Sequence, residues 1–184
     1  MNYITLQDKI DAELLEDRKV FLWGMVDDQS AKHVVERLLY LEKINPGKEI
    51  QFIINSNGGY VTSGFSIYDT MKGISSPVST ICSGLAASMG SILLSAGEKG
   101  RRFVLPHAKV MIHQPSGGAG GQASNIEIQA EEIRKTKKIG AEILAENCGK
   151  SFEQIMKDFD RDYWMDANES VQYGIVDALL NNIG

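Results

Sequence analysis

Cysteine is scarce in this chain of 184 residues, which contains only Cys82 and Cys148. Two cysteines so far apart exclude a disulfide framework and a CxxC metal site, so we expect reduced thiols. Positive charge is also in deficit: 19 Lys and Arg stand against 24 Asp and Glu, a net charge of -5, and only residues 134–138 form a basic cluster. This balance argues against contacts with a phosphate backbone, and therefore against nucleic-acid binding.

The sequence also lacks a long, pure apolar run. Residues 1–19 carry charges throughout, which does not fit an export signal. The uncharged stretch 73–97 is interrupted by Pro77, Gly84, Gly90 and several serines, a pattern more typical of a buried core than of a lipid-facing helix. We therefore expect a cytoplasmic protein without membrane contact.

Length and composition predict one compact domain over residues 1–184, because 43% hydrophobic and 23% charged residues are ordinary values for a globular protein. Short apolar runs alternate with amphipathic segments, which is typical of an α/β fold. We expect strands at residues 20–23, 50–54, 78–82, 102–105 and 109–113, and helices at about 27–42, 62–72, 124–147, 151 onward and 169–173.

Glycines mark the expected boundaries of these elements. The segment Asn57-Gly58-Gly59 is expected to end the second strand, and Gly84 to precede a helix whose first turn contains residues 87–89. Ser124 and Glu127 match a capping box for the long helix, which Gly149 ends. That helix has only a narrow apolar stripe, so it is predicted to project and to bury the stripe against another subunit.

The strongest local signal for chemistry is residues 86–90, Ala-Ala-Ser-Met-Gly. A serine between a buried strand and a helix has small neighbours that admit a substrate backbone, and free N–H groups at the helix start that stabilise an oxyanion. Ala86 occupies the first glycine position of G-x-S-x-G, which disfavours an α/β-hydrolase. Taken alone, Ser88 is more ordinarily a core serine bonded to a helix carbonyl.

A histidine and two aspartates are the next candidates. His113 ends an apolar strand, a position that suits a general base, although a lone histidine there is more often structural. His33, in a charged helix, and His107, in a proline-led turn, are weaker candidates. Asp160 or Asp162 is expected to be partly buried and to orient an imidazole, while this segment by itself also fits a solvated turn.

Two glycine-containing motifs do not support a nucleotide site. Residues 118–123 match G-x-G-x-x-A, but they follow the last run of strands and no partner strand comes after their helix. Residues 149–151, Gly-Lys-Ser, lack the earlier glycine of a P-loop and follow a helix rather than a strand.

Five segments taken together resemble the ClpP family of serine peptidases: 55–59 (Asn-Ser-Asn-Gly-Gly), 84–91 (Gly-Leu-Ala-Ala-Ser-Met-Gly-Ser), 111–115 (Met-Ile-His-Gln-Pro), 121–123 (Gly-Gln-Ala) and 160–162 (Asp-Arg-Asp). They run collinearly from about Val20 to Leu180, with Ser, His and Asp in the family's order and spacing. The resemblance implies an α/β fold, the ClpP/crotonase-like repeated ββα superhelix, with a projecting handle at about 116–148. It also implies a serine endopeptidase that degrades unfolded polypeptides and uses no cofactor or metal.

The resemblance assigns roles to individual residues. It implies Ser88 as nucleophile, His113 as general base and Asp162 as the carboxylate that holds the imidazole tautomer. It places the oxyanion hole at the N–H groups of Gly59 and Met89. Substrate would be bound by Gly58, Tyr60, Ser116, Gly117 and Gly118, with a glycine-rich strand at 116–118 pairing with one edge of the peptide. Asp160 and Arg161 would pair between rings.

For partners, the resemblance implies two stacked seven-membered rings, a tetradecamer, to which an AAA+ Clp ATPase delivers unfolded protein for quality control. The chain departs from the family at Asn57, where proline is usual. It also has Gln51, Gly73 and Ser83 where the family's ATPase-docking pocket carries large apolar or aromatic residues. We therefore expect a homo-oligomer or a mixed oligomer with a ClpP paralogue, whose ring would dock the ATPase.

Two alternatives stay open. One is a crotonase-like acyl-CoA enzyme, because that superfamily shares the fold and a glycine-rich oxyanion hole; the collinear Ser, His and Asp argue against it. The other is a scaffolding ring subunit of a heteromeric complex with little activity of its own, which the intact triad disfavours.

Overall fold

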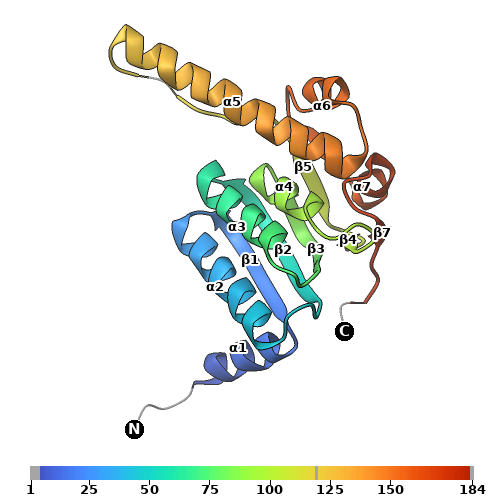
Figure 1. Cartoon of the computed structure of the whole chain (residues 1–184). Coiled ribbons are helices and arrows are strands. Elements are labelled where there is room, and N and C mark those ends of the chain that lie inside the picture. The colour runs from blue at the N-terminus through green and yellow to red at the C-terminus, as the bar shows by residue number, and fades with distance from the viewer. Residues whose placement is uncertain (1–4, 119, 183–184) are drawn as a thin grey trace.

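The computed structural model describes residues 5–118 and 120–182 of the chain. Its centre is a parallel sheet in the order β1-β2-β3-β4-β7 (Figure 1). A sixth parallel strand, β5, pairs with the end of β3, and β6 pairs antiparallel with β5. The strands are β1 (Lys19–Val26), β2 (Ile50–Gly59), β3 (Val78–Ala87), β4 (Arg102–Val104), β5 (Lys109–Ile112), β6 (Tyr163–Met165) and β7 (Ala178–Leu179).

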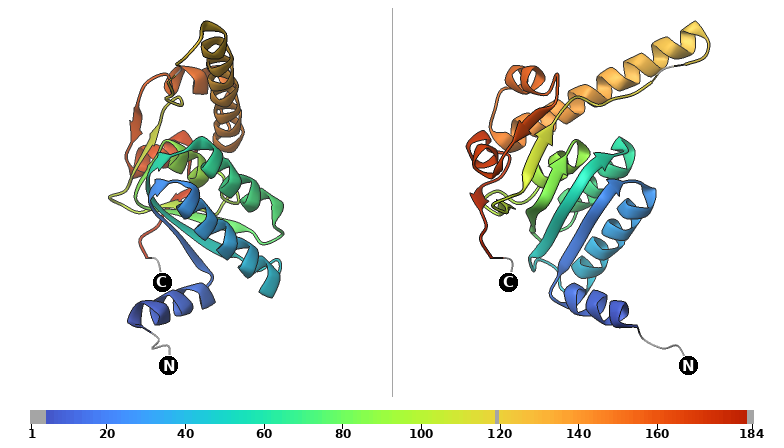
Figure 2. Two further views of the ribbon diagram at one scale, coloured as in Figure 1. Left: turned by 90° about the vertical axis from the view of Figure 1, so that its left-hand side faces the viewer. Right: turned by 180° about the vertical axis from the view of Figure 1, so that it is seen from behind.

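Helices alternate with these strands, which confirms the predicted α/β class. Three of them, α2, α3 and α4, lie side by side on one face of the sheet (Figures 1 and 2). The helices of the described residues are α1 (Leu6–Glu16), α2 (Asp28–Ile44), α3 (Val61–Gly73), α4 (Met89–Ser95), α5 (Ala123–Cys148), α6 (Phe152–Asp158) and α7 (Ala167–Tyr173).

The hydrophobic core lies between this helical layer and the sheet. Each of the three helices contributes fully buried side chains at helical spacing, and the strands contribute the opposite wall. Burial of one such side chain stabilises the fold by about 1.5 to 3 kcal/mol. The largest fully buried side chains of β1, β2 and the three helices are Phe52, Leu22, Leu38, Leu41, Ile50, Ile54, Ile67, Leu93 and Leu94.

Helix α1 has no counterpart among the helices predicted from the sequence. Leu6, Ile10 and Leu14 repeat at helical spacing, but none of the residues of α1 is buried, so this short apolar stripe does not enter the core. A capping box begins it: the Asp8 N–H donates to Thr5 Oγ1 at 3.1 Å, and the Thr5 N–H donates to Asp8 Oδ2 at 2.8 Å.

Two predicted strand boundaries at the functional end of the sheet are wrong. Strand β2 does not end before Asn57, because Gly58 and Gly59 pair with the end of β1. Strand β3 also continues, through Ala87, because its last residues pair with β5. In both cases a neighbouring strand supplies backbone hydrogen bonds that the local glycines do not predict.

Helix α5 projects from the body of the molecule, as the narrow apolar stripe predicted (Figures 1 and 2). Its end is also as predicted, since Gly149 is a left-handed C-cap with a φ of 66°. Its predicted capping box is wrong, because the N-cap is Gln122 and Ser124 lies inside the helix. Within the described residues, no helix combines the length and apolarity needed to cross a bilayer.

Candidate active site

Ser88 lies in the one-residue turn between β3 and α4. Its φ of 55° and ψ of -123° lie outside the ordinary regions for a residue with a side chain, a strain often found at functional sites. The Ser88 N–H donates to the Met111 carbonyl at 2.9 Å, which ties the turn to β5. The α4 serines that bond main-chain carbonyls are Ser91, whose Oγ donates to Ser88 O at 2.6 Å, and Ser95, whose Oγ donates to Ile92 O at 2.8 Å.

Glycines at the end of β2 allow the backbone to approach this turn closely. Gly58 has a φ of 86°, and a Cβ added to it would lie 2.7 Å from both the Ala87 oxygen and the Ser88 Cβ. A Cβ added to Gly59, where φ is 156°, would overlap the Val26 carbonyl. Only glycine fits at either position, so the backbone lies directly against Ser88 at Gly58 and against Val26 at Gly59.

The end of β2 lies close to the start of α4. Met89 is the first residue of α4, so its N–H has no acceptor within the helix. A Cβ on Gly58 would be 3.0 Å from the Met89 nitrogen, which shows how near the strand end lies to the helix start. On the β1 side, the Val26 carbonyl accepts from the Tyr60 N–H at 2.8 Å, one residue beyond Gly59.

The pairing of β5 with β6 brings His113 to Asp162. Ile112 is opposite Tyr163, so the next residues of the two antiparallel strands are neighbours. His113 Nδ1 lies 3.0 Å from Asp162 Oδ1. The side chain of His113 is 26% exposed, whereas that of Asp162 is 59% exposed.

The expectation of a partly buried aspartate is wrong for this single chain. The Asp160 side chain is 57% exposed, close to the value for Asp162. Both residues lie in the connection that precedes β6, and β6 is an edge strand that pairs only with β5 in the described sheet. Solvent therefore reaches the carboxylates from the open side.

Ser88 and His113 face the same small recess, of about 30 Å³. Among the hydrogen bonds of the described residues, none joins the two side chains. Such bonds are often long in a resting site and tighten only with substrate bound. The other lining residues are Val61, Met89, Ile92, Pro115, Thr136, Gly140 and Phe159.

A wider groove of about 710 Å³ continues from His113 along residues 114–117 and 160–162. Ser116 and Gly117 line it, and Gly118 follows as an exposed residue. The predicted strand at 116–118 is not present, since residues 113–118 have no regular secondary structure. In the described chain these residues have no neighbouring strand with which to pair.

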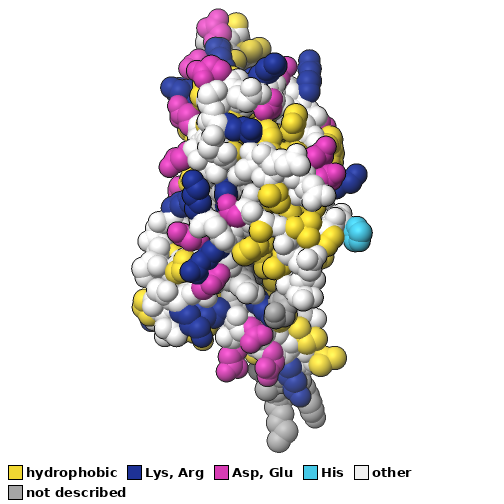
Figure 3. Space-filling model, turned by 90° about the vertical axis from the view of Figure 1, so that its right-hand side faces the viewer, with side chains coloured by type: hydrophobic (Ala, Val, Ile, Leu, Met, Phe, Trp, Pro, Cys, Tyr) yellow, Lys and Arg dark blue, Asp and Glu magenta, His cyan; other side chains and the backbone are white. Residues whose placement is uncertain are grey.

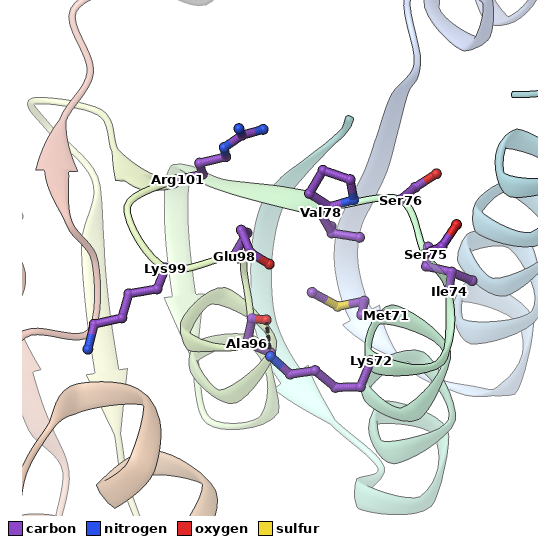
Figure 4. A pocket seen from close by; sticks show the side chains of 11 residues that line it. Met71, Lys72, Ile74, Ser75, Ser76, Val78, Ala96, Glu98, Lys99 and Arg101 are labelled. Atoms are coloured by element: carbon purple, nitrogen blue, oxygen red, sulfur yellow. Dashed lines mark hydrogen bonds between the residues drawn. The ribbon is translucent and has the colours of Figure 1, made fainter. Parts of the chain in front are cut away.

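The other cavities lie away from these residues. The one in Figure 4, of about 510 Å³, lies between the end of α3, residues 74–78 and residues 96–101. Lys72 Nζ donates there to the Ala96 carbonyl at 2.8 Å, at the end of α4. No residue expected at the catalytic site lines this cavity.

The weaker candidates from the sequence lie elsewhere. His33 Nδ1 is 2.8 Å from an Arg37 nitrogen on α2, and burial together with that guanidinium lowers the pKa of His33. His107 is exposed in the connection between β4 and β5. Burial raises the pKa of the Cys82 thiol to about 11 and that of Cys148 to about 12, so neither is a ready thiolate nucleophile.

The Clp protease family model matches residues 5–182. This chain belongs to the Clp protease family. It is 54% identical over 169 residues to the ATP-dependent Clp protease proteolytic subunits of two strains of Bacteroides fragilis, an alignment that covers 92% of this chain and 82% and 77% of the two relatives.

The resemblance inferred from the five motifs is therefore confirmed. The chain is a serine-type peptidase subunit of the Clp type, and neither the acyl-CoA enzyme nor the scaffolding alternative is favoured. Membership of the Clp protease family implies oligomeric assembly and partnership with Clp ATPases.

Sequence reasoning missed two residues that contact each other beside this site, since Lys137 Nζ donates to Gln114 Oε1 at 2.7 Å. Both lie beside the expected residues, Lys137 in the basic cluster of α5 and Gln114 directly after His113. A lysine in a charged helix ordinarily points to solvent, so the sequence contains no signal that would have singled it out.

Proposed function

We propose that Ser88, His113 and Asp162 form the catalytic triad of an endopeptidase that cleaves unfolded polypeptides. The observation that carries this proposal is that Ser88 and His113 line one recess while His113 Nδ1 contacts Asp162 at 3.0 Å. A serine triad needs an imidazole near the serine hydroxyl and a carboxylate bonded to the other nitrogen of that imidazole.

The reaction follows from these roles. His113 Nε2 takes the proton of Ser88 Oγ while the oxygen attacks the peptide carbonyl, and Asp162 holds Nδ1–H so that Nε2 is the free nitrogen. His113 then returns the proton to the departing amine, which leaves an acyl-enzyme on Ser88. Water attacks the ester in the second half, again with His113 as base, and frees both the acid product and Ser88.

The negative charge of the tetrahedral intermediate falls on the former carbonyl oxygen. We assign its stabilisation to the N–H groups of Gly59, at the end of β2, and of Met89, the residue after Ser88. Removal of one such donor typically costs about 10² to 10³ in kcat. The substrate backbone would lie between Gly58 and Tyr60 on one side and residues 116–118, Ser-Gly-Gly, on the other. Because glycine has no side chain, both segments leave room for the substrate to form main-chain hydrogen bonds.

The recess beside Ser88 is suited to the apolar side chain that precedes the cleaved bond. Gly140 of α5 forms part of its wall, and a Cβ there would lie 3.6 Å from Ile92 Cδ1, an ordinary contact. We expect Gly140→Ala to raise Tm slightly, because alanine favours a helix over glycine by about 1 kcal/mol. We expect it to lower kcat/KM about tenfold for peptides with a large apolar residue at this position, relative to peptides with alanine.

The measurement is the ratio of kcat/KM between two peptides that differ only at this residue, one with a large apolar side chain and one with alanine. Differential scanning calorimetry gives Tm. Gly73→Ala is the matched control, because Gly73 is also helical and has nothing within 4 Å of an added Cβ. An unchanged ratio in Gly140→Ala would show that the recess does not select the side chain.

The proposed assembly is a tetradecamer of two stacked seven-membered rings with a single peptidase domain per chain, spanning residues 1–184. Residues 1–4, 119, 183 and 184 of that span lie outside the described residues. Support comes from exposed apolar side chains on α5, where Ile128 is 63% exposed and Ile139 is 44% exposed. Asp160 and Arg161, which would pair between rings, have side chains that are 57% and 91% exposed.

Apolar side chains also gather on the face that carries α6, α7 and the C-terminal segment, between charged groups (Figure 3). Tyr163 and Trp164 of β6 are 39% and 52% exposed. Such surface suits contact with further subunits. A cytoplasmic location is part of the same proposal, supported by the two free cysteines.

The ATPase partner is proposed to dock mainly on a paralogous ring. Gln51 lies on β2 between Lys19 and Ser79, and among the described residues its Oε1 is a buried oxygen without a hydrogen-bond partner. The polar amide of Gln51 stands where the resemblance implies a large apolar side chain, and the loss of such an anchor weakens contact with an apolar docking loop. The alternative is a homomeric ring of this chain that docks the ATPase directly.

A serine-directed fluorophosphonate tests the peptidase site. The assembled protein is treated with the probe, digested with a second protease and analysed by mass spectrometry. We expect the label on Ser88 and none on Ser91, which is the internal control because it lies three residues away and its Oγ is bonded to Ser88 O. Labelling of another serine, or none in a preparation that hydrolyses peptides, would refute the assignment.

A further inference from the structure

Polar contacts connect α5 to the segment that carries Asp162. Lys137 Nζ donates to Gln114 Oε1 at 2.7 Å. The amide of the same glutamine, Nε2, donates to the Asp160 carbonyl at 2.7 Å and approaches Asp160 Oδ1 at 3.3 Å. Gln114 directly follows His113, and Asp160 is two residues before Asp162, so these contacts join the two chain segments that hold the imidazole and the carboxylate.

The backbone supports the same connection. The Gln114 N–H donates to the Phe159 carbonyl at 2.6 Å, and Phe159 is only 2% exposed. Residues 113–118 and 159–162 are otherwise irregular or turn segments, without a ladder to hold them in register. Gln114 therefore bonds the segment before β6 through both its backbone and its side chain.

Lys137 is held inward, unlike its neighbours on α5. Its side chain is 23% exposed, against 58% for Lys135 and 68% for Lys138. Besides Gln114 Oε1, its ammonium has two further neighbours: Asp160 Oδ1 at 3.9 Å and the Phe159 ring, whose centroid is 5.8 Å away. A cation that meets an amide oxygen, a carboxylate and an aromatic face restricts all three groups at once.

We propose that Lys137 and Gln114 are positioning residues for the peptidase reaction, an inference that rests on the triad proposed above. Neither touches the reacting atoms; their role is to hold residues 159–162 against the end of β5, so that Asp162 Oδ1 stays within reach of His113 Nδ1. Asp162 is mostly exposed, and its position depends on the segment that carries it.

Loss of Lys137 is expected to reduce the fraction of molecules in which His113 and Asp162 are aligned. Without the Lys137 ammonium, Gln114 Oε1 loses its donor, the amide is free to rotate, and the bond to the Asp160 carbonyl is made less often. The measured kcat falls with the fraction of molecules in which His113 and Asp162 are aligned. Misplacement by about 1 Å can cost about 10²-fold in rate.

The test compares kcat and KM for a fluorogenic peptide in the full assembled protein. Lys137→Met removes the charge and keeps much of the length, and it is expected to lower kcat about 10- to 100-fold with KM within about twofold. Lys137→Arg restores the cation and is expected to recover kcat to within about threefold. Lys138→Met is the matched control: Lys138 is paired with Glu142 at 3.6 Å and is expected to keep full kcat.

Native mass measurement accompanies each variant, because Asp160 is also proposed to pair between rings. If Lys137→Met does not assemble, Gln114→Asn serves instead, since it keeps the lysine and shortens the side chain by one methylene; it must show the same selective loss of kcat. Unchanged kcat, an equal loss in Lys138→Met, or a loss seen only in disassembled protein would overturn the proposal.

Kinetics of Ser88→Ala distinguish an error in the proposed triad from an error in the positioning role. Ser88→Ala that still hydrolyses the peptide would refute the triad itself and this inference with it. Inactive Ser88→Ala together with full kcat in Lys137→Met would refute only the positioning role.

Discussion

Replacement of Ser88 by alanine is expected to reduce kcat for peptide hydrolysis by about 10⁴- to 10⁶-fold, because no other side chain at the recess supplies a nucleophilic oxygen in its place. Thr136 also lines the recess, but it belongs to α5 rather than to the turn that meets the predicted oxyanion donors. The activity that remains would come from binding and from the backbone N–H groups alone.

The measurement is hydrolysis of a fluorogenic peptide, with native mass to show that the assembly is unchanged. Ser66→Ala is the matched control, since Ser66 Oγ donates to the Ser63 carbonyl at 2.8 Å on α3, outside the site. Residual activity above about 1% of the parent's in a pure Ser88→Ala preparation would contradict the nucleophile assignment, because serine nucleophiles contribute far more than that.

Replacement of Asp162 by asparagine is expected to lower kcat by about 10³- to 10⁴-fold. The amide is nearly isosteric with the carboxylate, but it lacks the negative charge that stabilises the imidazolium. Its NH₂ group also favours the tautomer in which Nε2 of His113 carries the proton, so that Nε2 cannot accept the proton of Ser88. We expect little change in KM, because Asp162 is not assigned to substrate binding.

The rate loss is measured as kcat on the same peptide, and Asp69→Asn, an exposed carboxylate on α3, is the control. The double variant of Ser88→Ala with Asp162→Asn should be no slower than Ser88→Ala alone, because residues that act as a unit lose their effect together. If Asp162→Asn kept kcat within about tenfold of the parent, the orienting role of this carboxylate would be refuted.

The α/β class and most elements could be predicted from local patterns. Hydrophobic periodicity located α2 and α3, and Gly149 and Gly174 end their helices in left-handed conformations as glycines are expected to. The ends of β2 and β3 could not be predicted, because their pairing with β1 and β5 depends on strands distant in the chain. Helix α1 escaped prediction for a different reason, because its few apolar residues are surrounded by charges and none of them is buried.

Residue identities and spacings by themselves predicted a serine at a strand-to-helix turn, a histidine at a strand end and a pair of consecutive glycines. They also identified the family to which this combination belongs. The tertiary structure alone decided that the β5–β6 register brings His113 to Asp162, that the aspartate is exposed, and that Lys137 reaches Gln114. The physical reason is that composition and periodicity report local preferences, whereas distances between side chains depend on strand register and on the packing of segments far apart in the sequence.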